Sequence, residues 1–198
     1  TDGDASSWKT NVRGSMGRIV EPVSDDPKRP IVFVGPYEHH SNLLPWREAD
    51  CDYVEIGVNE SGKLNKEELR QKLRQYKNRF PLLLMLMRSP LKIVTLNHVS
   101  NVTGIITPMS DINILVHEEH AFICWDCATA CSHEAPMMNN TSVHALDYCD
   151  ALFMSPHQMV GGVGCPGLLI LKKKFLVNDV PNMPGGGTIF YVNKDMHR

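Results

Sequence analysis

Short apolar runs alternate along this chain with stretches that have the periodicity of amphipathic helices. Each run is only a few residues long, which suits a strand better than a helix. Strands that alternate with helical patterns are typical of an α/β protein, in which helices cover a central sheet. The runs that we interpret as strands are residues 31–34, 53–56, 93–96, 122–125, 151–154 and 168–171.

The sequence around Asn65 has the local signals of a helix start. Asn65 can act as the N-cap residue, and Glu68 stands three residues later, where it would complete a capping box. Leu64 and Leu69 occupy the two positions of a hydrophobic staple. The buried stripes that we predict are residues 69, 73 and 76 of this helix and residues 112, 115 and 116 of a second helix, which opens at Thr107-Pro108.

One apolar segment, residues 80–87, has no clear periodicity and comes just before the third strand. A buried strand, a partner-binding patch and a divergent insertion all agree with its composition. The sequence leaves these three interpretations open.

Length and charge narrow the class of protein. With 198 residues, of which 42% are apolar, the chain can bury one sizeable core, and its length favours one domain over two. The formal net charge is -2, and the only basic run, residues 172–174, is interpreted as a solvated strand end. Nucleic acid and acidic membranes call for a basic excess, so we expect neither as a partner.

The sequence also bears on the compartment. No apolar stretch approaches the ~20 residues that a membrane span requires. The first residues are polar, so no signal peptide is visible. The six cysteines have no framework-like spacing, which favours reduced thiols. We therefore expect a cytoplasmic protein.

Residues 162–167, G-V-G-C-P-G, match the glycine pattern of dinucleotide-binding loops. In a dinucleotide fold these glycines lead into a helix whose N-terminus holds the pyrophosphate. Here Pro166 interrupts the pattern and an apolar strand follows. We therefore reject a dinucleotide site.

Cys124, Cys127, Cys131 and His133 lie within ten residues, and four such ligands can in principle hold zinc. A zinc knuckle needs a tight turn between its paired cysteines. Cys124 instead lies on an extended strand, with Asp126 on the same face and Cys127 on the other. Ordinary buried thiols are the favoured interpretation, and we expect no metal.

Five short motifs occur in order along the chain and carry a far more specific signal. They are Glu38-His39-His40-Ser41-Asn42, Ser100-Asn101-Val102-Thr103-Gly104, Trp125-Asp126-Cys127-Ala128, Ser155-Pro156-His157-Gln158 and Gly161-Gly162-Val163-Gly164. Their order and spacing, over about residues 13–190, resemble the class V, fold type I pyridoxal-phosphate enzymes, which include cysteine desulfurases and selenocysteine lyases. The resemblance implies the large domain of that fold, a three-layer α/β/α arrangement with a mostly parallel mixed sheet.

The resemblance also implies a role for each matching residue. His39 would stack on the pyridine ring, Asn101 would hydrogen-bond its phenolic oxygen, and Asp126 would pair with its nitrogen. A protonated ring nitrogen makes the ring the electron sink that the chemistry requires. Ser155 and His157 would hold the phosphate. Each residue alone has an ordinary explanation as a turn, cap or surface residue, but together they favour a cofactor site.

The chain departs from the family where the chemistry is centred. After His157 the family carries the lysine that forms the Schiff base with the cofactor, and here that position is Gln158. An amide cannot form an imine, because its nitrogen lone pair is delocalised, and it cannot shuttle the substrate proton as an amine does. Thr129 is a shorter donor than the glutamine of the desulfurases, and Met16 stands where a threonine would donate to the phosphate.

Two functions from different classes remain open. One is an enzyme-derived protein that acts on a small amino acid, impaired by Gln158 and holding pyridoxal phosphate non-covalently. The other is a pseudoenzyme that serves as a binding or scaffold protein. A glutamine introduced to trap a complex would leave the same sequence.

The resemblance carries two further expectations. The family's active sites form at a dimer interface, so a homodimer is implied. We also expect residues 1–198 to form a single partial large domain, from which the small C-terminal domain and an N-terminal segment are absent.

Overall fold

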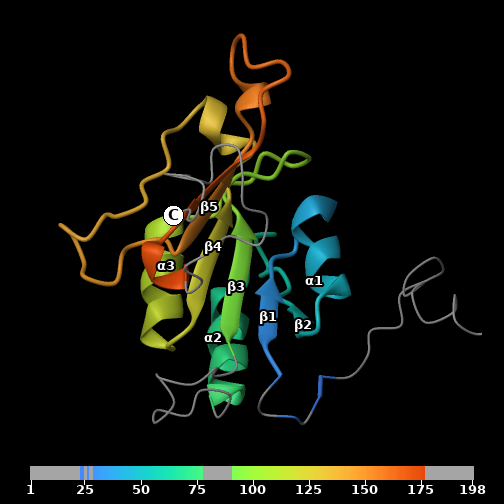
Figure 1. Cartoon of the computed structure of the whole chain (residues 1–198). Coiled ribbons are helices and arrows are strands. Elements are labelled where there is room, and N and C mark those ends of the chain that lie inside the picture. The colour runs from blue at the N-terminus through green and yellow to red at the C-terminus, as the bar shows by residue number, and fades with distance from the viewer. Residues whose placement is uncertain (1–22, 25, 27–28, 78–90, 177–198) are drawn as a thin grey trace, which may run out of the picture.

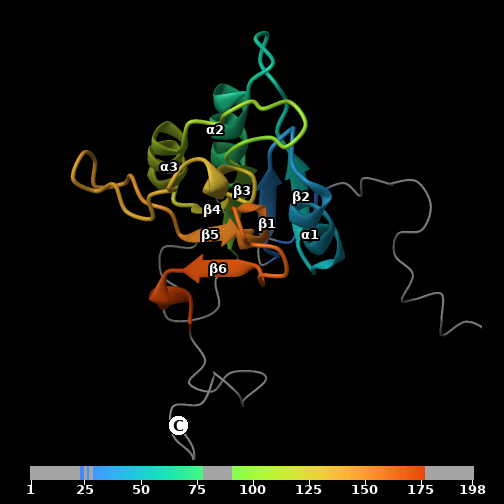
Figure 2. The same ribbon diagram turned by 90° about the horizontal axis from the view of Figure 1, so that it is seen from above.

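The computed structural model describes residues 23–24, 26, 29–77 and 91–176, which include a six-stranded sheet (Figures 1 and 2). The strands are β1 (Ile31–Val34), β2 (Asp52–Glu55), β3 (Lys92–Asn97), β4 (Phe122–Asp126), β5 (Ala151–Met154) and β6 (Leu168–Leu171). Their order is β2-β1-β3-β4-β5-β6, and all neighbours are parallel except β5 and β6. This mostly parallel mixed sheet confirms the α/β fold class that the sequence predicts.

Helices lie on both faces of this sheet. The helices are α1 (Leu44–Glu48), α2 (Lys66–Gln75) and α3 (Met109–Glu118). The chain steps from β1 to β2 in one direction and from β2 past β1 to β3 in the other, so right-handed crossovers place α1 and α2 on opposite faces. Figure 2 shows α2 and α3 side by side on one face, with α1 beside β1 and β2.

The structure confirms the predicted N-cap of α2, Asn65, but not the predicted role of Glu68. The Asn65 side chain accepts a hydrogen bond from the Glu68 amide at 3.1 Å, and Leu64 and Leu69 are both buried. The Glu68 carboxylate does not return to Asn65 and instead accepts from the Gly57 amide at 2.9 Å. The predicted capping box is therefore wrong in its second half, because a contact with the loop after β2 takes the Glu68 side chain.

Strand positions agree well with the sequence. The observed bounds of β1, β5 and β6 are those predicted, β4 extends one residue further, and β2 and β3 each differ from the prediction by one residue at both ends. Helix α1 was not predicted, since five residues are too few to show a period, although Pro45 in its first turn is a known start signal. The apolar segment 80–87 and Met16 lie outside the described residues.

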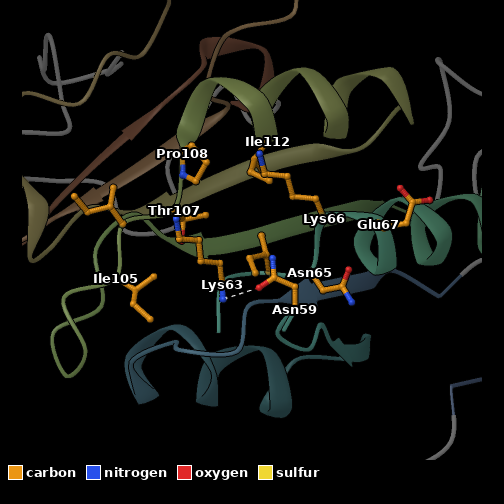
Figure 3. A pocket seen from close by; sticks show the side chains of 11 residues that line it. Asn59, Lys63, Asn65, Lys66, Glu67, Ile105, Thr107, Pro108 and Ile112 are labelled. Carbon is orange, nitrogen blue, oxygen red and sulfur yellow. Dashed lines mark hydrogen bonds between the residues drawn. The ribbon is translucent and has the colours of Figure 1, made fainter. Parts of the chain in front are cut away.

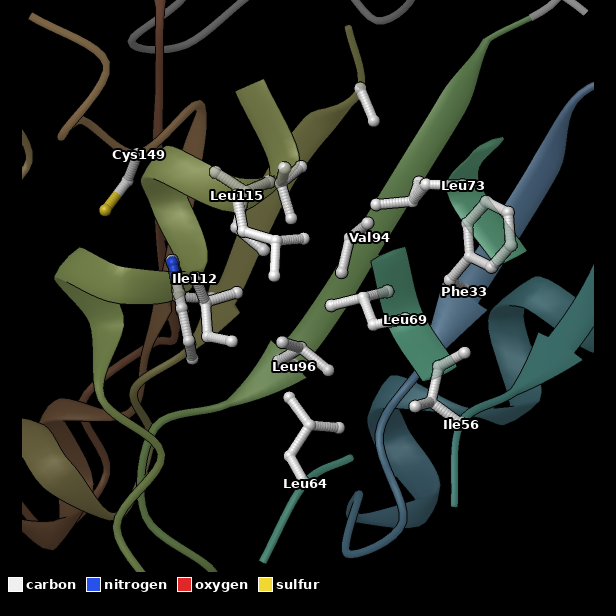
Figure 4. Close-up of a cluster of buried hydrophobic side chains, with 14 of the residues drawn as sticks. Phe33, Ile56, Leu64, Leu69, Leu73, Val94, Leu96, Ile112, Leu115 and Cys149 are labelled. Carbon is white, nitrogen blue, oxygen red and sulfur yellow. The ribbon is translucent and has the colours of Figure 1, made fainter. Parts of the chain in front are cut away.

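The core fills the space between the sheet and the pair α2 and α3 (Figure 4). Along β4, Ile123 and Trp125 are fully buried on this side. The Trp125 indole donates to the Asn113 side chain of α3 at 2.8 Å. Because side chains alternate along a strand, Cys124 and Asp126 lie on the opposite face of β4, as predicted. Trp125 packing therefore orients Asp126 away from the core.

None of the helices in the described ranges combines the length and the apolar character needed to cross a membrane.

Candidate functional site

The carboxyl ends of the five parallel strands meet at one edge of the sheet, which we call the carboxyl edge. The seven residues that the sequence proposes for the site all lie on it: His39 follows β1, Asn101 follows β3, Asp126 ends β4 and Thr129 follows it, and Ser155, His157 and Gln158 follow β5. The chain runs to opposite sides of β1 when it forms β2 and β3, and ligands of open α/β sheets bind near such a reversal. We therefore expect a ligand to bind at the carboxyl edge.

Asp126 is the half-buried last residue of the inner strand β4. Its Oδ1 accepts a hydrogen bond from the Ala128 amide at 2.9 Å, which is the turn role that a lone aspartate often has. Its other carboxylate oxygen forms no hydrogen bond within the described part of the chain. One oxygen thus shapes the turn after β4, and the other is available to a ligand.

A network around Glu38 ties the loop after β1 to β3. The two carboxylate oxygens of Glu38 accept from the Asn97 amide at 2.9 Å and from the Asn42 side chain at 2.7 Å. The Asn42 carbonyl oxygen in turn accepts from the Thr95 hydroxyl at 2.7 Å. Burial raises the pKa of the Glu38 carboxyl to about 7; the two hydrogen bonds oppose this rise, and the nearby charge of Asp126 adds to it.

Sequence reasoning missed Glu38, although the residue stands inside the first motif, directly before His39. A carboxylate inside a candidate site motif was the available signal. Its importance depends on Asn97, which lies 59 residues away.

His39 is held by local contacts at the N-terminus of the turn η1 (His40–Asn42). Its Nδ1 accepts from the Ser41 amide at 3.2 Å and lies 3.0 Å from the Ser41 hydroxyl. The neutral ring therefore carries its proton on Nε2. The centroids of the His39 and His40 rings are 3.9 Å apart.

The turn η4 (Pro156–Gln158) follows β5 and presents the last predicted residues. The backbone amide of Gln158 donates to the Ser155 carbonyl at 3.0 Å, and the side chains of His157 and Gln158 are exposed. A Cβ atom at Gly162 would lie 1.9 Å from the Pro156 carbonyl oxygen, so only glycine allows this close approach of the chain. The Cys131 thiol, 3.8 Å from the Ser155 carbonyl, links this turn to the loop after β4.

Asn101 lies in the exposed loop after β3. The preceding Ser100 shapes this loop, since its hydroxyl accepts from the amides of Val102 and Thr103 at 3.3 and 3.2 Å. Gly104 closes the turn with a φ of 70°, a conformation that favours glycine. The motif thus has a clear structural role in presenting Asn101.

A second polar network lies near the opposite edge of the sheet, before β5. The buried Asp150 carboxylate contacts His117 Nε2 at 2.9 Å and accepts from the Ile123 amide at 3.0 Å. The Lys174 ammonium lies 2.7 Å from its other oxygen. Lys174 is exposed, as expected of a solvated strand end, and its ammonium also compensates the buried Asp150 charge.

The cysteines are free thiols. Burial raises the pKa of Cys124, Cys127 and Cys149 to about 12, so these three are protonated and unreactive at neutral pH. Among the residues that the structure describes, no group of three or more His, Cys, Asp or Glu side chains is arranged to hold a metal ion.

A cavity of 570 Å³ opens between the N-terminal ends of α2 and α3 (Figure 3). Apolar residues such as Ile105 and Ile112 line it, together with Lys63 and Lys66. None of the seven proposed site residues contributes to its wall. This cavity is therefore separate from the candidate site.

Solved structures share this fold. The apo cysteine desulfurase from Thermococcus onnurineus has a TM-score of 0.60 and 25% identity, covering 86% of this chain and 38% of that chain. The cysteine desulfurase CsdA from Escherichia coli has a TM-score of 0.58 and 23% identity, covering 85% and 38%. The likeness confirms the expected large-domain fold over part of its length.

Sequence comparisons agree with the structural ones. A cysteine desulfurase from Shigella sonnei is 28% identical over 162 residues, which are 80% of this chain and 34% of the relative. The chain thus spans about a third of the length of the curated relatives that it matches. Residues 22–197 match the model of the family described as aminotransferase class-V. Since that match includes all six strands and every motif of the carboxyl edge, the chain belongs to the aminotransferase class-V family.

Proposed function

We propose that this chain forms the cofactor-binding core of a pyridoxal-phosphate protein related to the cysteine desulfurases, and that it holds the cofactor without a covalent bond. The observation that carries the proposal is the position of Asp126. Its available carboxylate oxygen lies at the end of an inner parallel strand, between the loop that bears Asn101 and the turn that bears Ser155.

The donor set of the carboxyl edge fits the groups of pyridoxal phosphate, the cofactor of this family. Bound here, the cofactor would supply an electron sink for amino-acid chemistry. Asp126 would hold the ring nitrogen by charge, and the residues that would hold the remaining groups are His39 for the ring face, Asn101 and Thr129 for the phenolic oxygen, and Ser155 and His157 for the phosphate.

Gln158 decides between the two candidate functions. It occupies the last position of η4, where we place the cofactor-anchoring lysine of the family. Its amide can donate and accept hydrogen bonds but is not a nucleophile. The chain therefore derives from an enzyme for a small amino acid, and Gln158 favours a pseudoenzyme that binds the cofactor as part of a homodimer.

Covalency gives the direct test of this function. Pyridoxal phosphate should bind the full chain, as followed by ring absorbance, and dialysis should remove it. Borohydride should leave no cofactor on any peptide, because position 158 offers no amine. Gln158→Lys should become labelled at that position, and Gln158→Met, similar in length but without an amine, should not.

Two results would contradict this prediction. A stoichiometric cofactor adduct on a lysine of the unaltered chain would show that another residue has replaced the anchor. The absence of any binding would remove the cofactor from the proposal altogether.

Turnover should be absent as well. With cysteine or alanine and saturating pyridoxal phosphate, the chain should release neither sulfide nor keto acid above a protein-free blank. Ordinary enzymes turn over at about 1–10³ per second. A rate in that range would show that a base other than residue 158 performs the proton transfers.

A further inference from the structure

We propose that Glu38 is a second carboxylate of the cofactor site, which acts with Asp126 on the pyridine nitrogen and makes cofactor affinity depend on its own charge. This inference rests on the proposed function. It deepens that function by assigning a charge-bearing and positioning role to a residue beside the ring-binding histidine.

The two carboxylates lie on either side of the end of β3. Glu38 binds the amide of Asn97, the last residue of β3, and Asn97 is paired in register with Asp126 on β4. Neighbouring strands lie only about 4.8 Å apart. Because the backbone amide of His98 donates to the Asp126 carbonyl, the Asn97 amide points to the β1 side of β3. Strand β3 therefore lies between the two carboxylates, and the charge of Asp126 still acts on Glu38 across this strand.

The hydrogen bonds around Glu38 suit its charged form. The backbone amide of Asn97 is a fixed donor. The side-chain amide of Asn42 is held in one orientation because its oxygen already accepts from the Thr95 hydroxyl and the Trp46 indole. Both carboxylate oxygens therefore face donors, and neither partner can accept a proton from the acid form. Burial opposes the charge, so the two forms of Glu38 are finely balanced.

No positive group of the described chain compensates Glu38, which forms no ion pair there. The titratable groups near it are engaged elsewhere or carry negative charge. Asp126 of β4 repels it, the His98 ring after β3 contacts Thr107 and Glu134, and His39 on its own loop is bonded to Ser41. A cation placed beside Asp126 would therefore relieve both carboxylates, and a protonated pyridine nitrogen is such a cation.

Glu38 also positions the loop that carries His39. Its carboxylate lies against Gly35, where a Cβ atom would collide with it. The Asn97 side chain donates to the Tyr37 carbonyl at 2.5 Å, which fixes the residue before Glu38 to β3 as well. The loop between β1 and η1 is thereby fastened to the sheet on both sides of the acid.

The test compares Glu38→Gln with the unaltered full chain in pyridoxal phosphate titrations. Below the pKa of Glu38 both side chains are neutral, so affinities should be nearly equal at about pH 5.5. At about pH 8.5 only glutamate is charged, and the variant should bind roughly tenfold more weakly, the effect of one pKa unit. The protonation of the free cofactor is the same in both titrations, so it cancels in the ratio of dissociation constants, and the ratio reports only the bound state and Glu38 itself.

Glu48→Gln is the matched control, since it removes the same charge from an exposed position of α1 and should leave that ratio near one at both pH values. A second measurement, of thermal stability, needs no ligand. The acid form of Glu38 is favoured by folding, so the folded protein loses stability as pH rises from about 4.5 to about 7. The melting temperature of Glu38→Gln relative to the unaltered chain should rise over the same window.

The outcomes are distinct. A weakening of equal size at both pH values, or none at either, would overturn the role of Glu38 while leaving the cofactor site intact. A failure of the unaltered chain to bind would overturn the proposed function, and the Glu38 inference with it.

Discussion

Replacing Asp150 with alanine should lower the free energy of unfolding by about 1–3 kcal/mol at neutral pH, the usual cost of leaving buried donors without their acceptor. The side chain of Asp150 is only 1% exposed and contacts His117, Lys174 and the Ile123 amide. The alanine variant leaves the Lys174 charge and the Ile123 donor without their acceptor. Urea titration of both proteins measures the difference.

The pH dependence of this effect has a definite sign. Burial raises the pKa of the Asp150 carboxyl, but the hydrogen bonds from His117, Lys174 and Ile123 outweigh it and hold the pKa below its ordinary value. The stabilisation is therefore complete above the unfolded-state value of about 4 and is lost as pH falls through the lower folded-state value. The gap between variant and unaltered chain should close in acid.

Asp111→Ala is the matched control for Asp150. It also removes a carboxylate paired with a lysine, at 2.6 Å from Lys66, but the Asp111 side chain is 65% exposed. Exposed pairs contribute at most about 1 kcal/mol. An equally small loss for Asp150→Ala would show that the buried network is not what holds β4, β5 and the turn η5 (Lys173–Phe175) together.

Removing the charge of Asp126 should weaken pyridoxal-phosphate binding by about 1.5–3 kcal/mol, the range for a hydrogen bond to a charged group. Asp126→Asn is the informative change, because its side-chain oxygen can still accept from the Ala128 amide and preserve the turn. The variant should therefore keep its thermal stability while losing affinity. Absorbance titration and thermal melting of the same samples measure the two effects separately.

Two comparisons strengthen the Asp126 test. Ser155→Ala should lose less affinity, since other donors to the phosphate remain. Asp126→Ala should lose both affinity and the turn hydrogen bond. If Asp126→Asn binds as well as the unaltered chain, the carboxylate serves the turn alone, and the site is vestigial.

Much of the fold and the positions of the proposed site were accessible from the sequence. The six strands, the Asn65 cap and the stripe of α2 follow from periods and end signals within a few residues. The order of the motifs further indicated the family, and parallel strands then bring their carboxyl ends to one edge. His39, Asp126 and Ser155 share that edge for this reason.

Only the tertiary structure revealed the partners that lie far apart in the chain. Glu38 meets Asn97 because β1 and β3 are neighbours, and Lys174 meets Asp150 because β6 turns back antiparallel along β5. Glu68 likewise binds Gly57 rather than completing its local box. Local patterns record which face of an element is apolar, whereas strand order determines which polar groups are buried together. Burial raises the pKa of Glu38, and the hydrogen bonds that strand order brings to Asp150 outweigh burial and keep it charged.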